Sequence, residues 1–281
     1  MKSTLFFLKI FVFSILVLPI VSCSDDDNDG NNEISDPSLV EIVANNPELS
    51  SLAAALNRSG LLNTLEGDGP FTVFAPTNAA FQNFLTANGF DGLNDVPVDV
   101  LTQVLLNHVV EGDNRSTSLS TGYVSSLSTA GASGRNLSLF IDTEGGVTIN
   151  GVSDVIQADV VASNGVAHVV NAVIGLPTIV DHALGNEELS TLVSLLPQDF
   201  VDLLSGEGPF TLFAPDNAAF DAFDNPNGNE INNILANHVL SGSAAFSGGL
   251  ENGYVETLAA NADGDGINAY INTNNGVTIN G

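Results

Sequence analysis

The chain has 281 residues, 44% of them hydrophobic, and its 33 acidic and 5 basic residues give a formal net charge of −28. This length and hydrophobic content supply enough material for two domain-sized cores, and the composition carries no signature of wholesale disorder. The acidic charge argues against nucleic acids and anionic lipid headgroups as electrostatic partners, because both are themselves negatively charged. Cys23 is the single cysteine, which excludes an intramolecular disulfide.

The first 22 residues have the layout of a secretory signal peptide. Lys2 precedes an apolar stretch over residues 10–18, and Pro19 follows it. The stretch is too short for a membrane-spanning helix, which needs about 20 apolar residues. Ile20-Val-Ser-Cys23 resembles the lipobox of bacterial lipoproteins, which implies cleavage before Cys23 and acylation of this residue. The alternative is an ordinary signal peptide with an incidental cysteine.

Residues 23–34 are acidic and polar, so we expect a solvated tether that follows the lipidated cysteine. Asp25, Asp27, Asp29 and Asp36 have the spacing of calcium ligands in an EF-hand loop, but the preceding helix and the final glutamate of such a loop are missing. The tether also resembles the surface-export segment of some Gram-negative lipoproteins. This resemblance implies an exported protein, anchored by lipid at the outer-membrane surface.

The next segments predict helices first and strands later. Asp36 is the expected N-cap of a short helix that contains Leu39, and helical spacing predicts a second helix over residues 48–58 with Gly60 at its end. Residues 71–75 alternate as a strand, and Thr77 is the expected N-cap of a helix over residues 78–87. A further helix is predicted over residues 98–107, and short strands over 124–127, 137–141, 147–149, 155–161 and 166–174. This segregation favours an α+β fold with a mostly antiparallel sheet.

The chain contains two copies of one domain. The segment Pro70–Phe81 recurs as Pro209–Phe220 with ten of twelve residues identical, and later motifs recur in the same order. The period is a domain length, so we predict one domain over residues 35–177 and a second over residues 178–281. The second copy as given has no counterpart of residues 152–177, and if it ends at Gly281 it is expected to have an open sheet edge. We interpret the sequence as a piece of a longer reading frame.

Candidate functional residues are few. The sequence has no clustered metal ligands and no G-x-S-x-G nucleophile motif, so we expect no catalytic site, no cofactor and no metal. One polar pair recurs in both copies: Asn107-His108 and Asn237-His238 each follow an amphipathic helix. A histidine among apolar neighbours either meets a partner or hydrogen-bonds a backbone carbonyl, and the second role is the more common. If the pair has a binding role instead, the candidate partner-binding residues are Asn107, His108, Asn237 and His238.

Three motifs carry a family resemblance. Pro70–Phe81, Leu105–Val110 and Gly165–Pro177 resemble the fasciclin-like domain, over all of residues 35–177 and part of residues 178–281. The resemblance implies a wedge-like β-sandwich with packed helices, no catalytic apparatus, and attachment of cells to cells or to matrix. The family commonly has tyrosine before the histidine of the middle motif, where this chain has Asn107 and Asn237, so tyrosine-dependent recognition is not expected here.

These observations together predict a lipid-anchored surface protein that is not an enzyme and that presents two fasciclin-like domains for adhesion or matrix binding. Its expected partner is an extracellular protein or polysaccharide, with membrane contact through the lipid anchor and no nucleic acid. The alternative is a glycan-handling subunit that binds polysaccharide with the help of divalent cations.

Overall fold

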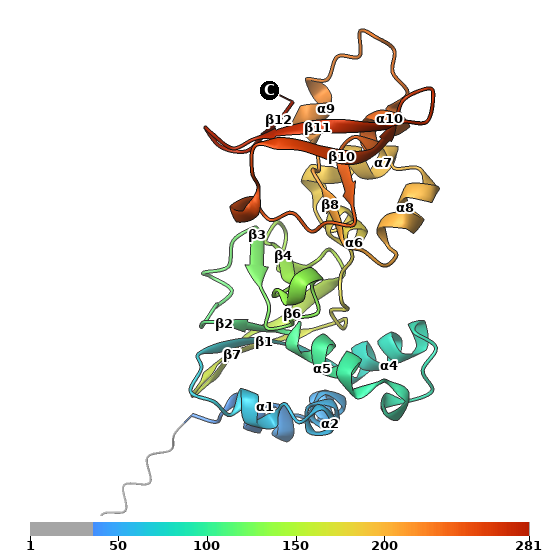
Figure 1. The fold of residues 1–281 in the computed structure, drawn as a ribbon. Helices are drawn as coiled ribbons and strands as arrows, with labels where there is room; N and C mark the ends of the chain where they lie inside the picture. Colours follow the sequence, from blue (N-terminus) through green and yellow to red (C-terminus); the bar gives the residue numbers. More distant parts are fainter. Residues whose placement is uncertain (1–35, 281) are drawn as a thin grey trace, which may run out of the picture. The chain divides into compact units, whose positions relative to one another are not determined.

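The computed structural model describes residues 36–280, and the predicted signal peptide, Cys23 and the acidic tether lie outside them. Copy 1 begins with the helices α1 (Leu39–Asn45), α2 (Ser50–Ser59) and α3 (Leu62–Leu65), followed by α4 (Asn78–Ala87) and α5 (Val98–Leu106). Its strands are β1 (Phe71–Pro76), β2 (Val109–Glu111), β3 (Gly122–Ser125), β4 (Ser138–Asp142), β5 (Thr148–Ile149), β6 (Ser153–Ala162) and β7 (Gly165–Val170). The predicted α+β class is confirmed (Figure 1).

Local side-chain chemistry sets the helix ends. Ser38 caps α1: its Oγ accepts a hydrogen bond from Glu41 N at 3.2 Å, and its own N–H donates to Glu41 Oε2 at 2.7 Å. The predicted cap at Asp36 is wrong by two residues, because Ser38 and Glu41 form a reciprocal capping box. Gly60 ends α2 with a left-handed φ of 72°, as its position in the sequence predicts.

The seven strands of copy 1 form one sheet in the order β2-β1-β7-β6-β5-β4-β3. Most neighbours are antiparallel, but β1 and β7 run parallel over six residue pairs, from Phe71 opposite Gly165 to Pro76 opposite Val170. An isolated bridge between Val110 and Ser126 joins the two ends of this order, so the sheet curls round on itself. The strand β7 is central and fully buried, which explains its continuous apolar sequence.

Two cores lie on the two faces of the sheet of copy 1. The larger core packs α1, α2, α4 and α5 against β1 and β7 through side chains that include Leu39, Leu52, Phe81 and Leu105. The smaller core fills the curled sheet with Phe74, Val110, Leu139, Ile141, Ile149, Val170 and Ile174. Both cores contain residues of the segment from Gly165 to Leu176, so this segment holds the two halves of copy 1 together.

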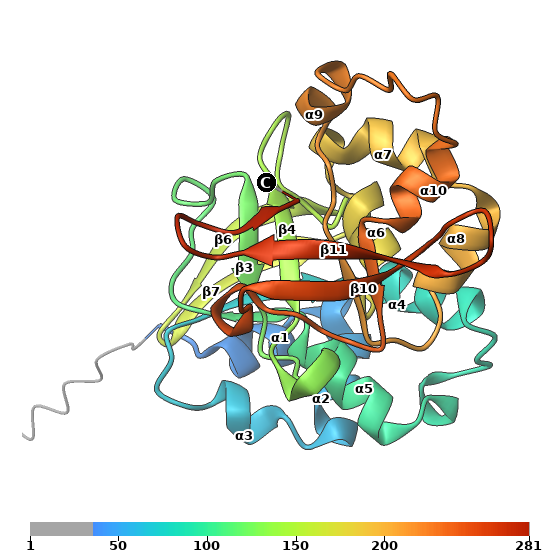
Figure 2. The same cartoon turned by 45° about the horizontal axis from the view of Figure 1, so that its top comes forward.

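Copy 2 repeats the early elements in the same order. Its helices are α6 (Ile179–Leu184), α7 (Ser190–Leu195), α8 (Gln198–Leu204), α9 (Asn217–Asp221) and α10 (Ile231–Ala236). Its strands are β8 (Phe210–Leu212), β9 (Val239–Ser241), β10 (Gly253–Ala260), β11 (Gly266–Asn272) and β12 (Thr278–Ile279), of which β10 and β11 form the long ribbon in Figure 2. The capping role predicted for this copy is confirmed, because Asp216 Oδ1 accepts from Ala219 N at 2.7 Å.

The strands of copy 2 form two separate sheets within the described residues. One contains β10, β11 and β12, and the other contains β8 and β9. In copy 1 the matching strands belong to a single sheet, because β6 and β7 link them. No helix among residues 36–280 combines the length and the apolar character that crossing a bilayer requires.

Candidate functional site

The pair Asn107-His108 lies at the end of α5, where the chain turns into β2. The amphipathic sequence of α5 buries Leu101, Val104 and Leu105 against the helical core. The two polar residues that follow are therefore directed into the protein, and the exposed fractions of Asn107 and His108 are 0% and 1%. The structure thus places half of the candidate partner-binding set in the interior of copy 1.

Both ring nitrogens of His108 bond to backbone atoms. Nδ1 donates to Val104 O at 2.7 Å, and Nε2 accepts from the N–H of Ile174 at 2.9 Å. These two bonds fix the neutral tautomer with its proton on Nδ1. Burial lowers the pKa of His108 to about 4, against a smaller opposing effect of the bond to Val104 O. His108 is consequently a neutral structural residue at ordinary pH.

Asn107 also bonds within copy 1. Its Nδ2 donates to Gly175 O at 2.7 Å, and its Oδ1 accepts from Ser126 Oγ at 2.8 Å. Asn107 and His108 thus bind adjacent residues of the segment that follows β7: Asn107 bonds to the carbonyl of Gly175, and His108 bonds to the N–H of Ile174. An external partner has no access to this pair in folded copy 1, and we interpret its role there as structural.

The matching pair Asn237-His238 in copy 2 forms only some of the hydrogen bonds that Asn107-His108 forms in copy 1. Asn237 Oδ1 accepts from Thr257 Oγ1 at 3.0 Å, and His238 Nδ1 lies 2.8 Å from Ile234 O, as in copy 1. Among residues 36–280, however, no hydrogen-bond partner occurs for Asn237 Nδ2 or His238 Nε2. Both residues are half-buried rather than fully buried. The described residues therefore enclose this pair less than they enclose Asn107 and His108.

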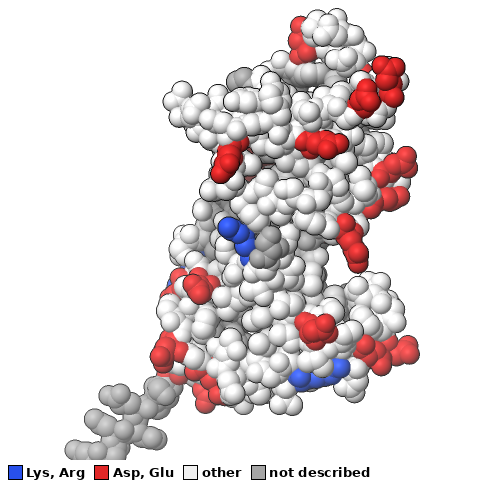
Figure 3. Space-filling view, viewed as in Figure 1, with Lys and Arg blue, Asp and Glu red and all other residues white. Residues whose placement is uncertain are grey.

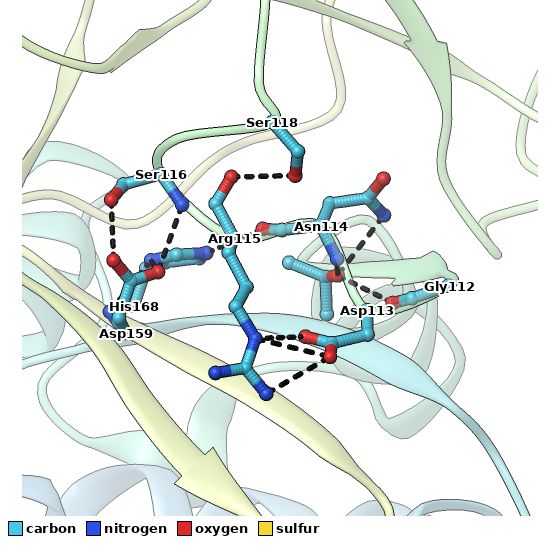
Figure 4. A network of polar contacts seen from close by, with 9 residues as sticks. Gly112, Asp113, Asn114, Arg115, Ser116, Ser118, Asp159 and His168 are labelled. Carbon is cyan, nitrogen blue, oxygen red and sulfur yellow. Dashed lines mark hydrogen bonds and ion pairs between the residues drawn. The ribbon is translucent and has the colours of Figure 1, made fainter.

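A second polar cluster ties the loop after β2 to the sheet of copy 1 (Figure 4). His168 Nε2 donates to Asn114 O at 2.9 Å, while its Nδ1 accepts from Asp159 N at 3.2 Å. Asp159 also accepts from Ser116, through both the backbone N–H and the hydroxyl. These bonds from Ser116 lower the pKa of Asp159.

This cluster has the residue types of a serine hydrolase triad but not its arrangement. A nucleophilic serine must donate to the histidine that takes its proton. Here Ser116 donates to Asp159, and both nitrogens of His168 already bond to backbone atoms, so no proton relay connects serine and histidine. The cluster fixes the loop over residues 112–118. Sequence reasoning missed it, because its members come from two segments, whose bonded residues are 43 and 54 positions apart, and they share no motif.

The described residues carry no group of three or more histidine, cysteine or carboxylate side chains that could hold a metal ion. On the face shown in Figure 3, acidic side chains occur over both copies and basic side chains are few. Two of the basic residues are engaged: Arg58 donates to the carbonyls of Val96 and Asn94, and Arg115 pairs with Asp113 at 3.1 Å. The electrostatic character of the described surface is therefore acidic.

The sequence model of the Fasciclin domain family matches residues 47–177 and 187–281. The chain is 39% identical to Protein sll1483 of Synechocystis over 136 residues, which are 48% of this chain and 72% of that protein. It is 30% identical to the transforming growth factor-beta-induced protein ig-h3 of Oryctolagus cuniculus over 213 residues, which are 74% of this chain but 30% of that protein. Its length thus spans less than a third of that animal relative.

A similar fold occurs in a solved structure, that of a FAS1 domain pair from the insect cell adhesion molecule Fasciclin I. The TM-score is 0.50 at 17% sequence identity, and the match covers 83% of this chain and 87% of that one. The predicted tandem arrangement and the predicted fold agree with these comparisons. The chain belongs to the fasciclin domain family and carries two regions of it in tandem.

Proposed function

We propose that this chain is a lipid-anchored adhesion or matrix-binding protein of the bacterial cell surface, which acts by binding and not by catalysis. The proposal rests on the two tandem matches to the fasciclin family, because fasciclin domains are found in cell-adhesion and extracellular matrix proteins. Two linked binding domains also raise avidity, since binding by the first places the second at high local concentration.

The anchor in this proposal is Cys23, which lies outside the described residues. Cleavage before Cys23 and its acylation with two or three chains would hold the protein durably at a membrane, because a single chain gives only marginal binding. The acidic tether over residues 23–34 would then separate the two domains from the lipid surface. The expected location is the outside of the outer membrane.

The charge of the chain restricts the chemistry of the partner. With a formal net charge of −28, the protein repels polyanions and favours neutral or basic extracellular proteins and neutral polysaccharides. The same acidic surface supports the second candidate function, polysaccharide binding bridged by divalent cations. Dependence on added cation separates the two candidates.

An adhesion assay with Cys23→Ser tests the proposal. Cells that produce the chain are expected to bind a collagen- and laminin-rich matrix extract or a neutral polysaccharide more strongly than cells that lack it. The variant should leave the membrane fraction, lose labelling by radioactive palmitate and reduce cell binding to the level of cells without the chain. Ser24→Ala, which keeps the cysteine, serves as the matched control.

Three results would count against parts of this proposal. Equal binding by cells with and without the chain would contradict the adhesion role. Retention of Cys23→Ser in the membrane fraction would contradict the anchor. Binding that is abolished by a chelator and restored by calcium would favour cation-dependent polysaccharide binding instead.

A further inference from the structure

A polar hollow opens in copy 1 where β2 and β3 part. These strands are the two ends of the sheet order, and an isolated bridge between Val110 and Ser126 joins them. Beside the bridge, the N–H of Leu127 donates to Val109 O at 2.8 Å. Among residues 36–280 the two strands form no longer ladder, and a cavity of about 400 Å³ lies next to the bridge on the side of Glu111. We call it the β2–β3 hollow.

The lining of the β2–β3 hollow combines exposed polar side chains with more buried apolar ones. The polar side chains come from β2, β3 and the loops that follow these strands: Glu111, Asn114, Ser125 and Asn136. Asn114 is half-buried and the other three are exposed. The apolar side chains are buried or half-buried and belong to the two cores of copy 1: Val110, Val124 and Leu127.

Most of the unused polar atoms in this lining are hydrogen-bond acceptors. Asn114 Nδ2 donates to Thr72 Oγ1 and to Glu111 O, both at 3.0 Å. Asn136 Nδ2 donates to Ser126 O at 2.6 Å. No donor within residues 36–280 bonds to the Oδ1 of either asparagine or to the carboxylate of Glu111. In Figure 4 the side-chain oxygen of Asn114 points away from the polar network that holds its nitrogen.

The repeat shows that these acceptors are not required by the architecture. Residues that build the fold recur, as Thr72 recurs as Thr211 with the same two hydrogen bonds. The acceptors do not recur: Glu111 is matched by Ser241, Asn114 by Ala245 and Asn136 by Gly266. Ser125 is matched by Glu256, so copy 2 has one carboxylate at a different position. The set of acceptors is therefore specific to copy 1.

No cationic side chain of the described residues lines the hollow. Arg115 pairs with Asp113 at 3.1 Å, and Arg58 donates to backbone carbonyls elsewhere in copy 1. Arg135 is not among the lining residues, and the sequence has no lysine after Lys9. The negative charge of Glu111 is thus not neutralised from within the described part of the chain.

We propose that the β2–β3 hollow binds an arginine side chain presented by an extracellular partner protein. A guanidinium carries a full positive charge and five N–H donors, which suit the carboxylate of Glu111 and the amide oxygens of Asn114 and Asn136. The methylenes of the arginine would lie against Val124 and Leu127. Lysine, with three donors on one nitrogen, would satisfy fewer of these acceptors.

This inference rests on the proposed binding role and states the chemistry of the partner, without requiring the lipid anchor. Arginine is also enriched in protein–protein interfaces and among the residues that contribute most to binding. The net charge of −28 favours the approach of a partner that presents a basic side chain.

A metal ion and a neutral sugar suit the hollow less well. Glu111 is the one carboxylate in the lining, and the described residues hold no group of three or more side chains typical of a metal site. Sugar hydroxyls accept as well as donate hydrogen bonds, whereas acceptors predominate in this lining.

An NMR titration of the full chain tests the hollow. The probe is a five-residue peptide with a central arginine between valine and threonine residues, and its twin carries citrulline, which has the shape of arginine without the charge. We expect saturable shifts of the amide signals of Glu111, Asn114 and Ser125 with the arginine peptide and none with the citrulline peptide. Glu111→Gln should weaken binding about tenfold, as the loss of one charge-assisted hydrogen bond does.

Glu144→Gln is the matched control, because it changes the net charge by the same amount. Glu144 is exposed on the turn between β4 and β5 and does not line the hollow, so its variant should bind the arginine peptide as the original chain does. Both glutamates are exposed, so neither change is expected to unfold copy 1.

Four results would overturn the proposal. They are the absence of saturable shifts with the arginine peptide, equal shifts by the citrulline peptide, and equal weakening by the two glutamate variants, which would indicate general attraction to an acidic surface. The fourth is a shift of the same amides by calcium chloride but not by the arginine peptide, which would favour a cation site. Adhesion of cells whose chain does not bind the arginine peptide would overturn the assignment of the hollow and leave the adhesion role intact.

Discussion

Replacing Phe74 by alanine is expected to lower the free energy of unfolding of copy 1 by about 3–5 kcal/mol, the usual cost of removing a buried phenylalanine ring. Phe74 is 1% exposed in the smaller core, and its ring stacks on that of His168 with centroids 5.7 Å apart. Close packing on every side prevents the neighbours from filling the space that the ring leaves.

The matched change in copy 2 should cost much less. Phe213 occupies the same position of the repeat but is half-buried, so Phe213→Ala is expected to cost less than about 2 kcal/mol. Urea-dependent hydrogen exchange, read by mass spectrometry on peptides of each copy, measures both values. Equal losses in the two copies would show that their cores are equally complete, contrary to the structure.

The stability of copy 1 is expected to fall as the pH drops from about 6.5 to 4, because His108 is neutral when folded. The pKa of His108 is about 4 in the folded protein, whereas the ordinary pKa of histidine, as in an unfolded chain, is 6.5. The unfolded chain therefore binds more protons within this window, and the contribution of His108 is fully present above pH 6.5 and lost toward pH 4. A shift of this size corresponds to roughly 3 kcal/mol.

The variant His108→Gln separates the pH dependence of stability caused by His108 from that caused by other titratable groups. One of these groups is His182, whose pKa is also lowered by burial. The variant should be less stable than the original chain at pH 7, and the difference should shrink by roughly 3 kcal/mol toward pH 4. The measurement is again urea-dependent exchange of copy 1 peptides, at several pH values. A difference that stays constant from pH 7 to pH 4 would contradict the assignment of His108 as a neutral buried residue.

Helices and their caps were the most predictable part of the fold. The predicted roles of Gly60, Thr77 and Asp216 are confirmed, because a cap depends on residues three or four positions apart in the sequence. Position 36 is the exception, since Asp36 and Ser38 are both residue types that cap helices and the reciprocal bond with Glu41 favours Ser38. Local chemistry of this kind is contained in a short window of sequence.

The partners of each strand were less predictable. The alternating side-chain pattern of residues 71–75 predicts a strand. This pattern does not indicate that Gly165–Val170 lies parallel beside that strand. The same limit applies to the candidate site. The sequence singled out Asn107 and His108 without showing that their partners are Gly175 and Ile174, more than 60 residues further on. Repetition identified the residues, and only the fold explains why they repeat.

Hydrogen exchange of the two matching strands tests the central claim most directly: that the two copies share one architecture, in which β1 has two neighbouring strands and β8 has one among residues 36–280. Amides of Phe71–Ala75 lie between β2 and β7, whereas those of Phe210–Ala214 have β9 alone as a neighbouring strand among the described residues. We predict that exchange in β1 is slower by about 100-fold or more than in β8, a difference of roughly 2.7 kcal/mol in local opening. Equal protection of the two segments in the full chain would contradict the claim.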